Sequence, residues 1–210
     1  MLCSIGYTLR SGSSVLECFL HIFNRTDMEN TLLCFANIAV GSNDNYQIIY
    51  TPSIQWSTGH RKRSFQPWPV NNDVDASWYK NNKSSASWFA MNHEYDFVAG
   101  YDHGKKTGIM SVANHNIVQG KKFFTWCVGS NCDKIITDNQ PDYLWLQPYE
   151  ERSFELSWYP FRGFDRVKMA NLDAAVNFEI KKTVQHSGSM QLKLIQVQKS
   201  FLKGDSKVLF

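Results

Sequence analysis

The sequence lacks the features that would place the protein in a membrane or on a nucleic acid. Its 210 residues contain no apolar run of about 18 residues, the length that a membrane-spanning helix needs. The first residues, Met1-Leu2-Cys3-Ser4, show no basic stretch followed by an apolar one, so no secretory leader is visible. A formal net charge of +3 is too small to predict a nucleic-acid partner. We therefore expect a cytoplasmic protein that binds neither membrane nor nucleic acid.

Cysteine pairs and the common catalytic motifs are also missing. Five cysteines are an odd number in a chain of this length, which argues against a disulfide framework and favours a reducing compartment. Cys18 and Cys34 lie within apolar runs and are expected to be buried thiols. Four residues separate Cys127 from Cys132, but no second pair follows, and there is no His-Glu-x-x-His, glycine-rich phosphate loop or Gly-x-Ser-x-Gly. We expect neither a metal ion nor a cofactor.

Aromatic residues, in contrast, make up 14% of the chain, and apolar side chains recur with a period of two. In residues 14–23, the even-numbered side chains from Leu16 to Ile22 are all apolar, and Phe19 and Phe23 add apolar groups to the opposite face. Because successive side chains of a strand point to opposite faces, this run predicts a strand covered on both faces.

Comparable alternating runs, separated by turn residues, recur along the whole chain. They lie at residues 4–10, 31–40, 46–56, 86–91, 95–101, 107–113, 122–128, 153–160, 173–181, 190–198 and 206–210. A helical period is not sustained over more than about ten residues, and only residues 165–175 are expected to form a helical turn. Many short strands predict an all-β, antiparallel β-sandwich that forms residues 1–210 as one domain or a large fragment of one. Residues 59–85 are the longest irregular stretch.

Several long motifs together point to a known family. Tyr101-Asp102-His103-Gly104 is one of them; the full set lies at residues 7–17, 23–26, 36–40, 44–47, 94–104, 112–122, 138–150 and 170–177. Over roughly residues 6–177 the chain resembles the bacterial family called domain of unknown function 5107. The resemblance implies a partial galactose-mutarotase-like supersandwich and a carbohydrate partner. It also implies that a tetratricopeptide-repeat region can follow this domain, outside this chain.

The sequence departs from the family pattern in two places. Family members usually have a further stretch of β-sheet before the strand that contains Tyr7. They also carry a longer acidic segment with a Tyr-Ile-Glu-Leu-like strand where residues 129–137 stand here. The chain therefore looks truncated at its N-terminus and internally, and the second gap removes a carboxylate that could have been catalytic. A sheet without its neighbouring strands leaves an exposed edge.

Two segments carry the residue types that bind sugars, namely flat apolar rings and planar hydrogen-bonding groups. In the loop at residues 59–69, His60 and Arg61 are predicted to hold an anionic or hydroxyl-rich ligand on which Trp68 stacks; alternatively, the loop is solvated and Trp68 docks on the core. In residues 139–145, Gln140 and Asp142 are predicted hydroxyl ligands and Trp145 a stacking platform.

The candidate catalytic residues lie near turns. Asp102 and His103 follow an apolar strand, so Asp102 either orients a histidine or accepts backbone N–H groups in an Asx-turn with Gly104 at positive φ. His115 is either a second acid–base group or an exposed histidine beside a turn.

We therefore arrive at a carbohydrate-active or carbohydrate-binding protein. If it is an enzyme, the resemblance implies a histidine acid, His103 or His115, and a carboxylate base, Asp102 or Asp142, acting on a sugar ring or a glycosidic bond. The alternatives are a non-catalytic binding or scaffolding module and an inactive truncated paralogue. Under each of these hypotheses, we expect His60, Asp102, His115 and Asp142 to surround one aromatic-lined hollow.

Overall fold

The computed structural model describes residues 1–32, 36–41, 43–59, 65–82, 86–90, 94–115, 123–126, 135–137, 144–163, 166–182 and 190–199. Nearly all regular structure in these ranges is β-strand, and their one helical element is the 3-10 turn η1 (Tyr79–Asn81). The helical turn expected at residues 165–175 is wrong, because Met169–Ala170 and the residues from Ala174 onward are strands. No helix in this described part is long and apolar enough to cross a membrane.

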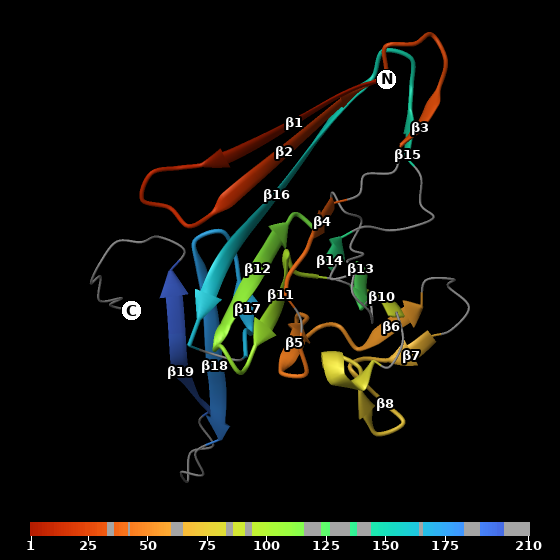
Figure 1. Cartoon of the computed structure of the whole chain (residues 1–210). Helices are drawn as coiled ribbons and strands as arrows, with labels where there is room; N and C mark the ends of the chain where they lie inside the picture. The colour runs from red at the N-terminus through yellow and green to blue at the C-terminus, as the bar shows by residue number, and fades with distance from the viewer. Residues whose placement is uncertain are drawn as a thin grey trace.

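A central antiparallel sheet organises the molecule (Figure 1). Within the described residues it has six strands in the order β1-β2-β16-β12-β11-β5. Their bounds are β1 (Leu2–Leu9), β2 (Leu16–Phe23), β16 (Glu151–Arg162), β12 (Thr107–Ala113), β11 (Phe97–Asp102) and β5 (Tyr46–Ile49). Every neighbouring pair is antiparallel, so strands far apart in the chain, such as β2 and β16, lie side by side.

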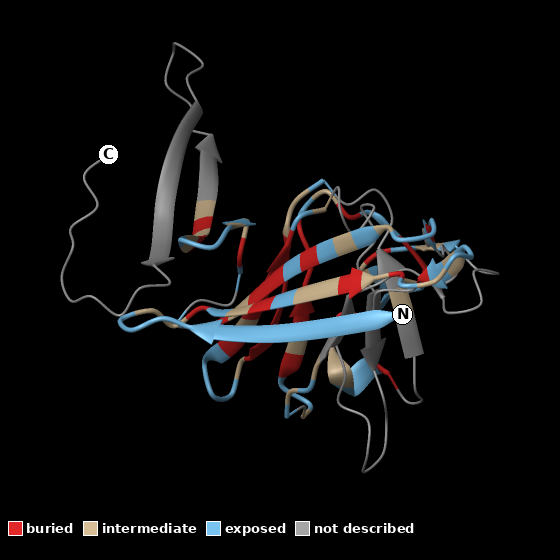
Figure 2. Cartoon of the chain, turned by 90° about the horizontal axis from the view of Figure 1, so that it is seen from above, coloured by how far each residue is buried: buried red, intermediate tan, exposed pale blue. Residues whose placement is uncertain are grey.

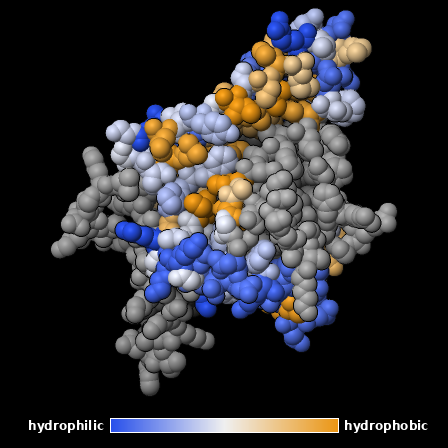
Figure 3. All heavy atoms as spheres, in the orientation of Figure 1, coloured by the Kyte–Doolittle hydropathy of each residue, from blue (hydrophilic) through white to orange (hydrophobic). Residues whose placement is uncertain are grey.

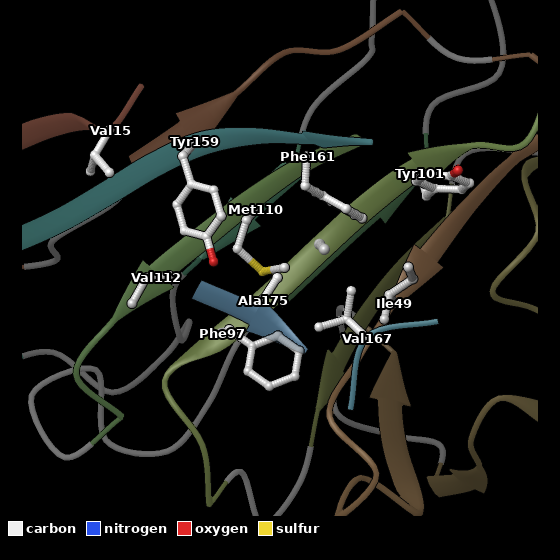
Figure 4. Packing of buried hydrophobic residues seen from close by; sticks show 11 residues of the cluster. Val15, Ile49, Phe97, Tyr101, Met110, Val112, Tyr159, Phe161, Val167 and Ala175 are labelled. Atoms are coloured by element: carbon white, nitrogen blue, oxygen red, sulfur yellow. The ribbon is translucent and has the colours of Figure 1, made fainter. Parts of the chain in front are cut away.

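The middle of this sheet is buried on both faces because alternate side chains of β11 enter two different cores. Phe97 and Tyr101 pack in a cluster with Met110 (Figure 4), whereas Val98 belongs to a second cluster with Trp68. All six residues of β11 are buried as a result.

Two smaller sheets supply the covering layers. One has the order β13-β10-β6-β7 and contributes Trp88 to the edge of the second cluster. The other has the order β17-β18-β19, and the first cluster includes Ala175 from β18 and Val167 from the segment before β17. The bounds are β13 (Phe123–Trp126), β10 (Ala86–Ala90), β6 (Trp56–Gly59), β7 (Phe65–Pro67), β17 (Met169–Ala170), β18 (Ala174–Lys182) and β19 (Met190–Lys199).

Three short two-stranded ladders complete the described structure. They are β3 (Asn30–Leu32) with β15 (Leu144–Leu146), β4 (Ala36–Ile38) with β14 (Ile135–Thr137), and β8 (Val70–Asn71) with β9 (Val74–Asp75). The residues predicted to be irregular, 59–85, therefore contain β7, β8 and β9 in their described part. The antiparallel all-β class predicted from the alternating pattern is confirmed.

Burial falls away toward the β1 edge of the sheet. All eight residues of β1 are exposed (Figure 2), and exposed hydrophobic side chains lie among polar ones on the β1–β2 hairpin (Figure 3). Leu16 and Phe19 of β2 are 36% and 43% exposed, while Cys18 and Ile22 are buried. The prediction that residues 14–23 are covered on both faces is therefore wrong for β2. The buried thiol predicted at Cys18 is confirmed, and Cys34, Cys127, Cys132 and residues 206–210 lie outside the described residues.

Beyond the end of β2, a fully buried asparagine ties distant segments together. The side-chain amide of Asn24 donates to the carbonyl oxygens of Met28, Leu146 and Gln147, at 2.8, 3.2 and 3.0 Å. Its oxygen accepts from the Thr26 N–H and hydroxyl and from Asn30, at 3.2, 2.8 and 2.9 Å. Asn24 also begins an Asn-Arg-Thr sequence that matches a glycosylation acceptor. Because the amide is buried and hydrogen-bonded, it is not accessible for glycosylation in the folded protein.

Candidate functional site

A cavity of about 720 Å³ lies at the β5 end of the central sheet. Its apolar wall includes Tyr50, Ile54, Trp68 and Val167. Its polar and charged side chains come from β5 and the residues after it, from β9 and the residues after it, from the β11–β12 turn and from the segment before β17. They include Gln47, Asp75, Ser77, Trp78, His103, Arg166 and Lys168.

Four of these polar residues form one chain of hydrogen bonds. His103 Nε2 lies 2.9 Å from Gln47 Oε1, and Gln47 Nε2 donates to Ser77 Oγ at 3.0 Å. The Ser77 hydroxyl donates to Asp75 Oδ1 at 2.6 Å. The chain therefore runs from the histidine ring to the carboxylate through an amide and a hydroxyl.

The direction of these hydrogen bonds determines which ring nitrogen of His103 carries the proton shared with Gln47. Gln47 presents its oxygen to His103 because its amino group faces Ser77, and an amide oxygen only accepts. The proton between the two side chains consequently sits on His103 Nε2.

Aromatic contacts hold the His103 ring in place. It stacks on Trp78 with a centroid distance of 4.6 Å and an interplanar angle of 29°, and Tyr101 meets it edge-on at 5.0 Å. Its backbone N–H donates to the Asn45 carbonyl oxygen at 3.0 Å. The imidazole is thus oriented by the fold.

A tight hairpin positions Asp75. Strands β8 and β9 are joined by Asn72 and Asp73, whose φ angles are 48° and 63°. Two positive φ values are what a two-residue hairpin turn requires, and Asn and Asp tolerate them better than most residues. Asp75 pairs with Val70 across this hairpin and lines the cavity. The next residue, Ala76, is buried in the second cluster.

Trp68 also borders the cavity but is mainly a core residue. It is 7% exposed and packs edge-on against Tyr50 at 5.0 Å and tilted against Trp88 at 6.4 Å. Of the two readings made from the sequence, docking on the core describes this side chain. Trp145, the other predicted platform, lies on β15 and is 58% exposed, outside the cavity lining.

Asp102 is buried in a turn and turned away from this cavity. Its Oδ1 accepts the N–H groups of Gly104 and Lys105 at 2.9 and 3.0 Å, and Asn43 donates to Oδ2 at 2.8 Å. Positive φ falls on Lys106, at 56°, whereas the expected position was Gly104. Burial acts to raise the pKa of the Asp102 carboxyl, but the hydrogen bonds from Lys105, Asn43 and Gly104 outweigh it and lower that pKa. The carboxylate therefore stays ionised and stabilises the turn.

This lowered pKa predicts a pH dependence of stability. The charged form of Asp102 stabilises the fold above the ordinary aspartate pKa of about 4, and this contribution is lost as the pH falls through the folded-state value. We expect Asp102→Asn to lose about 1–2 kcal/mol of unfolding free energy at pH 7 and to show a shallower loss between pH 5 and pH 2, measured by urea denaturation. Asp27→Asn, at an exposed position, should follow the parent protein; an unchanged acid profile for Asp102→Asn would contradict this assignment.

His115 has a carboxylate partner that the sequence did not reveal. Its Nδ1 lies 2.7 Å from Asp96 Oδ1, and its backbone N–H donates to the same oxygen at 2.8 Å. Since an ionised carboxylate only accepts, the proton between the two side chains sits on His115 Nδ1. Asp96 also borders a second cavity, of about 600 Å³, which Glu155 and Asp173 share.

Among the described residues, the predicted catalytic residues Asp102 and His115 do not border one hollow. Asp102 ends β11 and Asp96 precedes it, so the Asp102 and His115 sites lie at opposite ends of the β11–β12 hairpin. Six residues of strand separate them by roughly 20 Å. The single hollow is thus wrong for this pair, and a dyad of His115 with Asp102 is ruled out. His60, Arg61, Gln140 and Asp142 lie outside the described residues.

The cavity residues that sequence reasoning missed are Gln47, Asp75, Ser77 and Trp78. A signal existed for Gln47, which stands between Tyr46 and Ile48 in an otherwise apolar strand. Asp75 and Ser77 are two residues apart, the spacing at which an aspartate accepts a following N–H, here from Ser77 at 3.0 Å. Across the described ranges, no three His, Cys, Asp or Glu side chains are grouped so as to hold a metal ion.

Comparison with known proteins places the chain in a family. A family model described as "Domain of unknown function (DUF5107)" matches residues 1–155. Among solved structures, a TPR-domain containing protein from Parabacteroides distasonis is similar, with a TM-score of 0.61 and 13% identity over 78% of this chain and 31% of that one. The Slr1438 protein from Synechocystis gives a TM-score of 0.59 and 9% identity over 77% and 55% of the two chains.

A third similar structure carries an enzyme name. A Klebsiella pneumoniae protein described as a candidate aldose 1-epimerase has a TM-score of 0.52 and 9% identity over 76% of this chain and 46% of that one. At such identities the likeness concerns the fold alone, so this chain shares its β-sheet architecture with these three proteins. The chain spans less than two thirds of each of these three proteins.

Proposed function

This chain belongs to the DUF5107 family, and from that premise we propose that it binds a saccharide in the cavity beside β5. The partner is then a carbohydrate. The tetratricopeptide repeats named for the Parabacteroides protein would, in a longer relative of this chain, lie outside these residues.

The size and the wall of the cavity support this proposal. At about 720 Å³ the cavity falls within the range of roughly 300–1,000 Å³ that small-molecule sites occupy, which is enough for one or two sugar rings. Tyr50, Ile54 and Val167 provide apolar surface for the C–H groups of a ring, while Gln47 and Asp75 provide planar hydrogen-bonding groups for hydroxyls.

The hydrogen-bond chain from His103 to Asp75 is the observation that carries the proposal. Gln47, Asp75 and His103 are half-buried at the cavity wall, where each hydrogen bond contributes only about 0.5–1.5 kcal/mol to folding because these groups could bond to water instead. Held in this way, the four side chains have fixed orientations before any ligand arrives. Preorganised polar groups of this kind reduce the entropy lost on binding and confer specificity for hydroxyl geometry.

Saccharide titration tests the proposal directly. We expect chemical-shift changes that saturate when monosaccharides are added to the ¹⁵N-labelled chain, with the largest changes at Gln47, Ser77 and His103. Gln47→Leu should weaken binding at least tenfold, because it removes the link between His103 and Ser77.

Gln147→Leu is the matched control for this titration. Gln147 is exposed beyond β15 and does not line the cavity, so this variant should bind as the parent protein does. The absence of saturable shifts with every sugar would overturn the proposal and favour an inactive paralogue.

Acid–base catalysis is the second candidate, and the 2.7 Å contact between His115 and Asp96 favours it. A histidine that is oriented by a carboxylate is a common arrangement for general acid–base catalysis. The same NMR samples separate the two candidates: faster exchange between the anomers of a sugar supports catalysis, and saturation without faster exchange supports a binding module.

A further inference from the structure

The charges around the cavity beside β5 go beyond what a neutral sugar needs. Among the described residues that line it, Arg166 and Lys168 carry positive charge and Asp75 is the carboxylate. A third cation, Lys80, stands 4.9 Å above the ring centroid of Trp78, which is itself part of the lining. The described charged residues at the cavity therefore carry a net positive charge.

The backbone segment that carries Arg166 and Lys168 is anchored in the core. Val167, between them in sequence, is 3% exposed and points into the first cluster beside Ile49 (Figure 4). The backbone N–H of Lys168 donates to the Val176 carbonyl oxygen at 2.9 Å, which fixes this segment on β18. Because Val167 is anchored in this way, Arg166 and Lys168 are carried on a segment whose backbone is fixed at the cavity wall.

Neither cation is neutralised by the protein in the part of the chain that the structure describes. The ion pairs of this part involve other residues, such as Arg10 with Glu17 and Arg152 with Glu150. Asp75, in turn, already accepts the Ser77 hydroxyl and N–H on Oδ1. The positive charges of Arg166 and Lys168 are therefore available to a ligand.

We infer that the saccharide taken by this cavity carries an anionic group, a carboxylate or a phosphate, which Arg166 and Lys168 hold. This inference rests on the proposed function and specifies its ligand. The guanidinium fork of Arg166 matches the two oxygens of either anion, and the Lys168 ammonium adds a point charge. Gln47 and Asp75 remain for the hydroxyl groups. The cavity is much larger than a bare anion, so the anion is one end of a ligand whose other end reaches the wall formed by His103, Gln47 and Ser77.

Calorimetric titration with three ligands of equal ring size tests this inference. At 50 mM salt we expect glucuronate or glucose 6-phosphate to bind at least tenfold more tightly than glucose, and the difference to shrink at 500 mM salt because the charges are screened. The tighter of the two anions identifies the source of the anionic group. Inorganic phosphate and acetate, titrated separately, should bind much more weakly than either anionic sugar.

A variant pair assigns the preference to Arg166. Arg166→Gln should reduce the ratio of anionic to neutral affinity to about threefold or less, a ratio that a partial loss of folded protein would not change. Arg25→Gln, which removes an exposed arginine outside the cavity lining, should leave the ratio as in the parent protein.

The outcomes separate this inference from the proposed function. Equal affinities for glucose and its anionic forms overturn the anionic ligand, and an unchanged ratio in Arg166→Gln overturns the role given to Arg166. Both results leave saccharide binding standing. Binding of inorganic phosphate as tight as that of glucose 6-phosphate, without glucose binding, overturns both and leaves a simple anion site. No binding of any ligand overturns both as well.

Discussion

Replacing Asn24 by alanine is expected to remove roughly 3–4 kcal/mol of the free energy of unfolding. The substitution deletes all six side-chain hydrogen bonds of a residue that is 0% exposed. It leaves the carbonyl oxygens of Leu146 and Gln147 without this donor, and water has little access to replace it. Urea denaturation at pH 7 measures the loss, which is large beside a total stability of about 5–15 kcal/mol.

Two further variants show whether the amide itself is responsible. Asn24→Asp keeps the shape but replaces the donor with an oxygen that faces three carbonyl oxygens, so it should destabilise as much as alanine does. Asn81→Ala is the control, because Asn81 is exposed and donates one hydrogen bond, to Asp75 O. A change below about 1 kcal/mol is expected there. An Asn24→Asp variant as stable as the parent protein would contradict the hydrogen-bond assignment.

Gly108→Ala is expected to reduce the free energy of unfolding by about as much as Asn24→Ala does. A Cβ on Gly108 would overlap the carbonyl oxygen of Gly100 on the paired strand and stand 2.6 Å from Cε1 of Phe161. Both obstacles belong to the centre of the six-stranded sheet, where Phe161 is 1% exposed and the backbone cannot move without breaking the ladder. We expect Gly108→Ala to cost about 3 kcal/mol or more and to lower the melting temperature by roughly 6–12 °C, as measured by differential scanning calorimetry.

The chain offers a matched glycine for comparison. Gly6 lies on the exposed strand β1, and a Cβ there would meet nothing within 4 Å. Gly6→Ala should therefore leave the unfolding free energy within about 0.5 kcal/mol of the parent value. Equal stability of the two variants would show that the sheet adapts at Gly108, and the close packing described for its centre would then be wrong.

Strand positions were predictable because the alternation of apolar side chains is a local property of the chain. The predicted run at residues 107–113 coincides with β12, and the run at 153–160 lies within β16. The short strands at Val70–Asn71 and Val74–Asp75 were missed since two residues carry no period, although Asn71-Asn72-Asp73 predicts a turn and the positive φ values of Asn72 and Asp73 confirm it. Burial of β2 was overestimated because alternation shows that two faces exist and does not show whether a neighbouring layer covers each of them.

The site was harder to predict than the strands. His103 and Trp68 were singled out from the sequence and do line the cavity. Gln47 lies in the motif at residues 44–47 but was given no role, and Ser77, which completes the hydrogen-bond chain, lies outside the motifs. His115 was identified without Asp96, whose partnership depends on the hairpin closing between them. A contact between residues 19 positions apart is decided by strand pairing, which spacing in the sequence does not encode.

The antiparallel β class, the family resemblance and most strand positions could be read from the sequence, since each of these depends on residue types at short spacing along the chain. Which polar side chains meet depends on the tertiary fold. It placed Asp102 and His115 at opposite ends of one hairpin, and it joined His103 to Asp75 through Gln47 and Ser77. The physical reason is that a strand fixes which face a side chain points to, whereas the pairing and layering of strands fix what that face meets.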